Sequence, residues 1–210
     1  MKKVFKILGI AVASIVGILI VFVVAILIKG PGDVIILTPE ERAQDEKEQT
    51  EIFAGIDLSG FKTVSVTGET VSSEDCFNDY KITMVNIWVT SCSPCIAEMP
   101  DIAALYKDRP EGSNIISICL DTAENAKDAK FAAEVMQDAK AEFMTLIPDK
   151  KIDEVLQERT TIFPTTIFVD SSGKAVGAPH FGGRTKDDYR KAILERMELI
   201  DSSESEVSNE

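Results

Sequence analysis

The stretch that decides the fold is Trp88-Val89-Thr90-Ser91-Cys92-Ser93-Pro94-Cys95-Ile96-Ala97-Glu98-Met99-Pro100. It follows an apolar run over 82–89 that is rich in β-branched residues and predicts a buried strand. Apolar residues then recur at helical spacing, so we predict a helix from about Ser93 to Tyr106. Cys92 is therefore expected where a strand gives way to a helix N-terminus. The free N–H groups and the positive dipole end there favour a thiolate over a thiol.

The Cys-x-x-Cys pair suits more than one kind of site. A thiolate attacks disulfides, so the strand-to-helix junction favours a redox-active pair, with Cys92 as the nucleophile and Cys95 as the resolving thiol. Zinc is disfavoured because a tetrahedral site needs four ligands. The other cysteines, Cys76 and Cys119, are single and widely spaced, and the chain has one histidine. An inert structural disulfide stays as an alternative.

From Asn86 to Pro100 the sequence resembles the active-site stretch of thioredoxin-like proteins. The closest branch is the membrane-tethered, extracytoplasmic thiol–disulfide oxidoreductases of the TlpA/ResA type. Phe163-Pro164-Thr165 resembles the cis-proline loop of that family, and the resemblance covers about Lys62 to Ile200. Ser91 stands where the family often has Trp. Asn86, which cannot titrate, stands where cytoplasmic thioredoxins have a buried Asp.

The resemblance implies roles for residues around the cysteine pair. Glu98 shares a helix face with Cys95, and the resemblance implies that it accepts and donates the proton of Cys95 during exchange. The alternative is an exposed first-turn carboxylate that stabilises the helix dipole. The resemblance also implies a cis Pro164 that leaves the backbone of Phe163 free to pair with an extended substrate, with Thr165 beside it. An ordinary trans proline at a strand start is the alternative. No metal and no organic cofactor are expected.

Strand-like and helix-like segments alternate along the rest of the chain. A small hairpin is expected around Gly68, and the segments after it are strands at 82–89, 114–120, 143–147, 165–169 and 174–181 and helices at 73–80, 93–106, 124–139, 150–158 and 185–200. This order, closed by a hairpin, predicts a thioredoxin fold over 60–200: a three-layer α/β/α domain with a central mixed sheet. The acidic residues 201–210 are predicted to be a disordered tail.

A membrane anchor is predicted at the N-terminus. Residues 7–28 carry no charge and would form a helix of roughly 33 Å, long enough to cross a bilayer. Three lysines precede the run and one, Lys29, follows it, which predicts a cytoplasmic N-terminus and an external domain. Residues 1–29 are then the cytoplasmic stub and anchor, and 30–59 an extracytoplasmic linker. A cleaved signal peptide is the alternative.

Charge and composition narrow the possible functions. The net charge of -13 and the isoelectric point near 4.6 argue against a nucleic-acid partner. The predicted function is a bacterial, membrane-tethered enzyme that reduces disulfides of extracytoplasmic proteins. Ser93-Pro94 between the cysteines offers no imidazole to stabilise a thiolate, so the dithiol should be reducing. A separate membrane thiol carrier would have to supply electrons. A polypeptide-binding module with a structural disulfide and a thiol peroxidase are the alternatives.

Four further residues are not assigned to the redox site. Cys76 and Cys119 are expected to be buried free thiols, although a second disulfide between them is possible. His180 is expected on the surface at a strand end, and Trp88 in the core.

Overall fold

The computed structural model describes residues 44, 47 and 51–207. The predicted anchor at 7–28 and most of the linker that follows lie outside these residues. Within the described part of the chain, no helix has both the length and the apolar character needed to cross a membrane.

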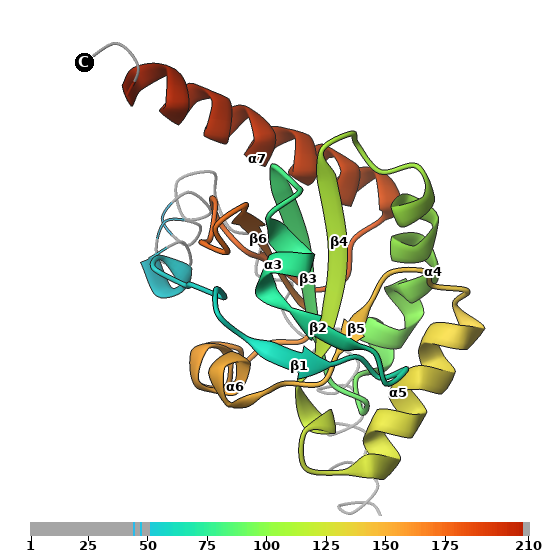
Figure 1. Ribbon diagram of the computed structural model, residues 1–210. Coiled ribbons are helices and arrows are strands. Elements are labelled where there is room, and N and C mark those ends of the chain that lie inside the picture. Colours follow the sequence, from blue (N-terminus) through green and yellow to red (C-terminus); the bar gives the residue numbers. More distant parts are fainter. Residues whose placement is uncertain (1–43, 45–46, 48–50, 208–210) are drawn as a thin grey trace, which may run out of the picture. The chain divides into compact units, whose positions relative to one another are not determined.

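A five-stranded mixed sheet forms the centre of the domain, in the order β5-β4-β3-β6-β7 (Figure 1). Its strands are β3 (Ile82–Trp88), β4 (Ser113–Cys119), β5 (Thr145–Leu146), β6 (Thr165–Asp170) and β7 (His180–Phe181). β3, β4 and β5 run parallel, whereas β6 and β7 are antiparallel to their neighbours. β3 and β4 are buried at every position, as expected for strands covered on both faces.

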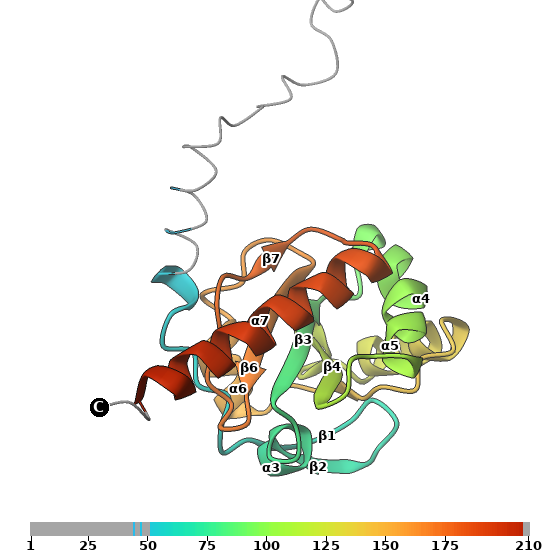
Figure 2. The same cartoon turned by 90° about the horizontal axis from the view of Figure 1, so that it is seen from above.

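Helices and loops cover both faces of the sheet. One hydrophobic cluster joins it to α4 (Ser93–Lys107), α5 (Ala126–Asp138) and α7 (Lys186–Val207). The cluster on the other face includes residues of the short strand β2 (Thr70–Ser72), α3 (Ser73–Phe77) and α6 (Lys150–Leu156). β2 pairs with β1 (Lys62–Val64), and a short 3₁₀ helix, η1 (Leu120–Thr122), follows β4. Figure 2 shows α7 and α3 on opposite sides of the sheet. The predicted three-layer thioredoxin-like fold is confirmed.

The alternation of side chains along β3 decides which residues can meet α4. Met84 and Trp88 belong to the cluster with α4 and α7, and Val85 and Ile87 to the cluster on the other face. Successive side chains of a strand point to opposite faces. Asn86 therefore faces α4, the helix that carries the cysteine pair.

The domain begins earlier than predicted. Phe53, Ile56 and Leu58 are each at most 2% exposed and lie in the core, so residues 53–59 are not linker. The turn at Gly173 holds this segment, because the Leu58 amide donates to the Gly173 carbonyl at 2.9 Å. Gly173 has φ +84°, and a Cβ there would meet the Ser59 nitrogen at 2.9 Å. Only glycine fits this approach without strain.

The predicted disordered tail is wrong for residues 201–207, because α7 continues to Val207. Asp201 forms an ion pair with Lys81. The hydroxyl groups of Ser202 and Ser203 donate to the carbonyls of Glu198 and Ile200, each at 2.8 Å. These contacts satisfy polar groups along the last turns of α7. The acidic composition of residues 201–207 does not predict them.

Candidate functional site

A disulfide joins Cys92 to Cys95 at the junction between β3 and α4. Cys92 is the N-cap of α4, and its sulfur accepts a hydrogen bond from the Cys95 amide at 3.2 Å. Pro94 occupies the first turn, where the lack of an N–H does no harm. Cys92 is partly exposed and Cys95 is fully buried. The predicted order of attack, Cys92 first and Cys95 second, agrees with this difference in exposure.

The Phe163–Pro164 peptide bond is cis, as the resemblance implies. The Pro164 carbonyl accepts from the Gly182 amide at 2.8 Å. Thr165 is fully buried, and its hydroxyl donates to the Ile162 carbonyl at 2.6 Å, so its side chain shapes the loop from inside. Phe163 and Cys92 both pack against the α4 cluster. In the described part of the chain, the backbone N–H and C=O of Phe163 have no hydrogen-bond partner within the protein.

Glu98 is buried, with 5% of its surface exposed. One carboxylate oxygen accepts from Asn86 Nδ2 at 2.8 Å. The other accepts from the Tyr189 hydroxyl at 2.8 Å and from the Arg184 amide at 3.2 Å. Burial raises the pKa of Glu98 above its ordinary value, although these three hydrogen bonds act in the opposite direction. The alternative of an exposed dipole carboxylate is therefore wrong.

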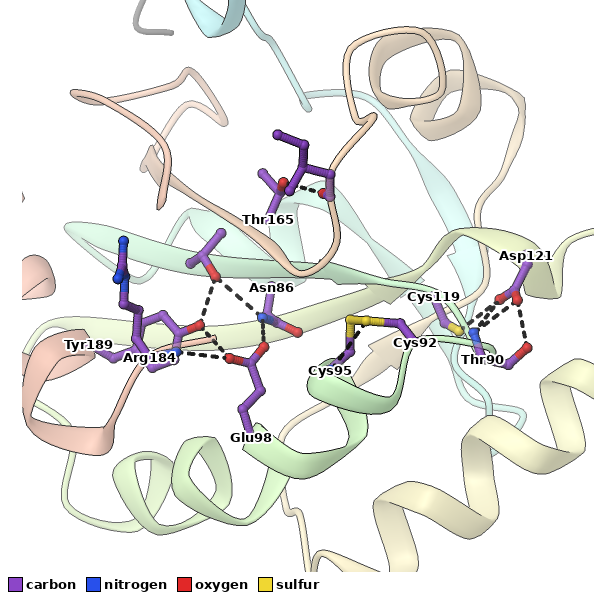
Figure 3. The surroundings of a disulfide bond; sticks show 12 residues. Asn86, Thr90, Cys92, Cys95, Glu98, Cys119, Asp121, Thr165, Arg184 and Tyr189 are labelled. Atoms are coloured by element: carbon purple, nitrogen blue, oxygen red, sulfur yellow. Dashed lines mark hydrogen bonds between the residues drawn. A yellow bond between two sulfur atoms is a disulfide. The ribbon is translucent and has the colours of Figure 1, made fainter. Parts of the chain in front are cut away.

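A polar network behind the disulfide connects four elements, α4, β3, β6 and α7. Figure 3 shows Glu98 on α4, Asn86 on β3 and Tyr189 on α7 turned toward one another. The Thr166 hydroxyl lies 3.3 Å from Asn86 Nδ2 and donates to the Tyr189 hydroxyl at 3.3 Å. Burial and the Glu98 charge raise the pKa of Tyr189, so its hydroxyl keeps its proton as a donor. Tyr189 and Thr166 lie 91 and 68 residues beyond Glu98, and no local pattern along the chain links them to it.

A second carboxylate lies on the other side of the disulfide (Figure 3). Asp121, just after β4, accepts from the Thr90 amide at 2.9 Å and from the Thr90 hydroxyl at 2.6 Å. The Cys119 thiol donates to the same carboxylate at 3.2 Å. Asp121 thus fixes the backbone two residues before Cys92. Sequence analysis did not identify it, because Thr90 and Asp121 are far apart along the chain.

Cys76 and Cys119 are buried and not joined by a disulfide, as expected. Burial raises the pKa of the Cys76 thiol to about 12 and raises that of Cys119 as well.

His180 is not on the surface as predicted but half-buried in β7. Burial, with Arg196 close by, lowers the pKa of His180 to about 4. Trp88 is fully buried, as predicted. Among the described residues, no group of three or more His, Cys, Asp or Glu side chains is arranged to hold a metal ion.

A mixed sheet with a disulfide at the start of the helix after β3, opposite a cis proline before β6, defines a thioredoxin-like protein. A family model described as Redoxin matches residues 42–192, and the chain belongs to the redoxin family. This match confirms the predicted resemblance to thioredoxin-like oxidoreductases.

Two curated relatives match most of the domain. The thiol-disulfide oxidoreductase ResA of Halalkalibacterium halodurans is 27% identical over 148 residues, which cover 70% of this chain and 77% of that protein. The thioredoxin-like protein YneN of Bacillus subtilis is 26% identical over 147 residues, which cover 70% of this chain and 82% of YneN.

Solved structures share the fold. A thiol:disulfide interchange protein of the thioredoxin family from Chlorobium tepidum gives a TM-score of 0.56 at 23% identity, covering 67% of this chain and 95% of that one. StoA from Bacillus subtilis gives a TM-score of 0.52 at 18% identity, covering 65% and 97%. These likenesses show the thioredoxin-like architecture.

Proposed function

We propose that the protein is a membrane-tethered thiol–disulfide oxidoreductase that reduces disulfides of extracytoplasmic proteins through Cys92 and Cys95. The observation that carries the proposal is the disulfide itself, with a partly exposed sulfur at the helix N-cap and a buried one a turn later. A helix N-terminus stabilises a thiolate at Cys92, the sulfur that a substrate can reach. The relative ResA, 77% of which aligns with this chain, is named as a thiol-disulfide oxidoreductase.

The reaction follows from the exposure of the two sulfurs. The Cys92 thiolate attacks a substrate disulfide, a mixed disulfide forms, and the displaced substrate sulfur takes up a proton. Cys95 then gives its proton to Glu98 and attacks the Cys92 sulfur. The second substrate sulfur leaves and takes the proton from Glu98, and the first has taken its proton from solvent. The substrate thus gains two electrons and two protons, Glu98 is again a carboxylate, and the enzyme returns to the disulfide. A membrane dithiol carrier returns two electrons and two protons to the pair.

Glu98 suits the role of proton acceptor for Cys95. A general base works best when its pKa lies near the working pH, and burial shifts the pKa of Glu98 in that direction. Glu98 lies one helical turn after Cys95 on the buried side of α4. The contacts with Asn86 and Tyr189 hold the carboxylate at this turn.

The loop around Pro164 is the proposed docking edge for the substrate. The unpaired backbone groups of Phe163 can hydrogen-bond an extended polypeptide beside the disulfide. Ile162, next to them, is 51% exposed and offers apolar surface to substrate side chains. Pro164 and Thr165 are buried and support this edge from beneath.

The charges around the pair favour the reducing direction. Two carboxylates, Glu98 and Asp121, belong to the hydrogen-bond networks that flank the disulfide, and the first turn of α4 has no basic residue. Negative neighbours raise the free energy of a thiolate. Since a strong oxidant needs a stabilised thiolate, this dithiol should act as a reductant.

Residues 7–28 are the proposed anchor, with the N-terminus in the cytoplasm and the domain outside. The apolar run and the lysine asymmetry support this topology. Protease added outside intact spheroplasts should remove the domain. A domain that resists this protease, or is released into the medium at reduced mass, would refute the anchor.

Alkylation of the reduced protein over a range of pH tests the enzyme against a binding module with a structural disulfide. We expect one fast-reacting thiol, Cys92, with a pKa well below that of free cysteine. Cys76 and Cys119 should not interfere, because burial raises the pKa of both thiols. Two thiols that react only at alkaline pH, like free cysteine, would favour the structural disulfide.

A further inference from the structure

Asn86 has a hydrogen-bond acceptor in the core that nothing in the oxidised protein uses. The residue is 0% exposed. Its Nδ2 faces two oxygens, Glu98 Oε1 at 2.8 Å and Thr166 Oγ1 at 3.3 Å. These two acceptors fix which arm of the amide carries the nitrogen. The other arm, Oδ1, is buried and has no hydrogen-bond partner, which is uncommon for a polar atom in a folded protein.

The free oxygen lies on the side of Asn86 where the disulfide is found. Asn86 projects from β3 toward α4, and the residues of α4 buried there include Cys95 and Glu98, one turn apart. Because Nδ2 is bound to Glu98, Oδ1 faces the preceding turn of α4, which carries Cys95. Figure 3 shows the amide oxygen directed away from Glu98, toward the side of Cys95.

Reduction creates the donor that this oxygen lacks. In the disulfide neither sulfur carries a hydrogen, so Cys95 has nothing to donate. When the pair takes up two electrons and two protons, the S–S bond breaks and each sulfur gains an S–H. Cys92 releases its proton at the helix N-terminus, whereas Cys95 is buried and keeps its own. A thiol is a weak donor, and a buried carbonyl without another partner is a suitable acceptor.

We propose that Asn86 is a positioning residue whose Oδ1 accepts the S–H hydrogen of Cys95 in the reduced protein, while its Nδ2 holds Glu98. This inference rests on the proposed function only in requiring that the pair be reduced. The one amide then holds the thiol that must give up a proton and the carboxylate that receives it. In the resolving step the S–H bond of Cys95 breaks and its proton goes to Glu98. The electron pair left on the Cys95 sulfur forms the S–S bond to Cys92, the bond between Cys92 and the substrate breaks, and the substrate sulfur leaves as a thiolate that is then protonated.

The infrared S–H stretch of the reduced full-length protein in detergent tests this directly, since a hydrogen-bonded thiol absorbs at lower frequency than a free one. Reduction by a phosphine and subtraction of the Cys95→Ala spectrum isolate the band of Cys95. We expect this band at the bonded frequency in the wild type. It should move to the free frequency in Asn86→Leu and stay shifted in Asn86→Asp, which keeps an acceptor oxygen.

Thr83→Val is the matched control. It removes a different buried hydrogen bond of β3, from the Thr83 hydroxyl to the Cys76 carbonyl at 3.0 Å, and should leave the Cys95 band in place. A wild-type band at the free frequency overturns the proposal even where Asn86→Leu does not fold. A band that Asn86→Leu leaves unmoved overturns it too. Reduction of insulin by the same wild-type sample is measured in parallel. Failure there would count against the proposed function, while the band still decides the role of Asn86.

Discussion

Replacing Cys95 by serine is expected to stop turnover and leave Cys92 covalently joined to its substrate. Cys92 is the sulfur that substrate can reach, so the first attack and the mixed disulfide should form at nearly the wild-type rate. Release needs the second sulfur, which a serine hydroxyl cannot replace as a nucleophile toward a disulfide. Turnover should fall to the rate of uncatalysed exchange, and non-reducing gels of membranes should show the captured proteins.

Cys92→Ser and Cys76→Ala are the controls for this experiment. Cys92→Ser should abolish both turnover and capture. Cys76 lies in α3, in the hydrophobic cluster on the face of the sheet away from α4, so Cys76→Ala should turn over normally. Capture that persists in Cys92→Ser, or that moves to Cys95, would reverse the roles of the two cysteines.

The second large effect is expected for Glu98→Gln. Glutamine keeps the size of the side chain but cannot take a proton from Cys95. General acid–base catalysis is typically worth about 10²-fold or more, so kcat/KM for disulfide reduction should fall by roughly that factor. The part of the pH–rate profile that reports ionisation of Glu98 should disappear. Glu134→Gln, on an exposed carboxylate paired with Lys130 at 3.7 Å, should leave the profile unchanged.

Stability should change in the opposite direction to activity in Glu98→Gln. The pKa of Glu98 is raised in the folded protein by burial, so the folded state holds this proton more tightly than the unfolded chain does. Its contribution to stability is complete below the unfolded pKa and is lost as the pH rises through the folded pKa. Denaturant unfolding should show the variant gaining stability relative to the wild type as pH rises through that range. A variant that is slow because it is less stable at neutral pH would contradict the catalytic role.

The parts of the site that the sequence predicts are those whose signal is local. Cys92 and Cys95 are three residues apart, and the apolar run before them and the helical spacing after them place the pair at the N-cap of α4. The order of strands and helices was predictable for the same reason, because each element has its own hydrophobic period.

The partners of Glu98 are far apart in the sequence and could not be predicted. The hydroxyl of Tyr189 reaches it across 91 residues, and nothing about a tyrosine on an amphipathic helix indicates which carboxylate it will meet. Burial of Glu98 follows from this contact, so the sequence leaves both the proton-transfer role and the exposed dipole role open. In the sequence, Asn86 stands out only as a departure from thioredoxin. Its orientation follows from the side-chain alternation of β3 once the strand has been placed.

The start of the domain could not be predicted for a related reason. Phe53, Ile56 and Leu58 are too few and too irregularly spaced to predict a strand or helix, yet all three are in the core. Their burial depends on the Gly173 turn, more than a hundred residues later. Segments fixed only by distant turns of this kind have no local pattern in the sequence.

The equilibrium redox potential of the Cys92–Cys95 pair tests the central claim most directly. The domain is equilibrated with glutathione buffers of known ratio, and the fraction of free dithiol is measured by alkylation and mass. A reductase should have a potential near thioredoxin's about -270 mV, because the site offers Cys92 only a helix N-terminus and has one carboxylate on each side of the disulfide, Glu98 and Asp121. A potential near the about -120 mV of a strong oxidant would contradict the account and make the enzyme an oxidase.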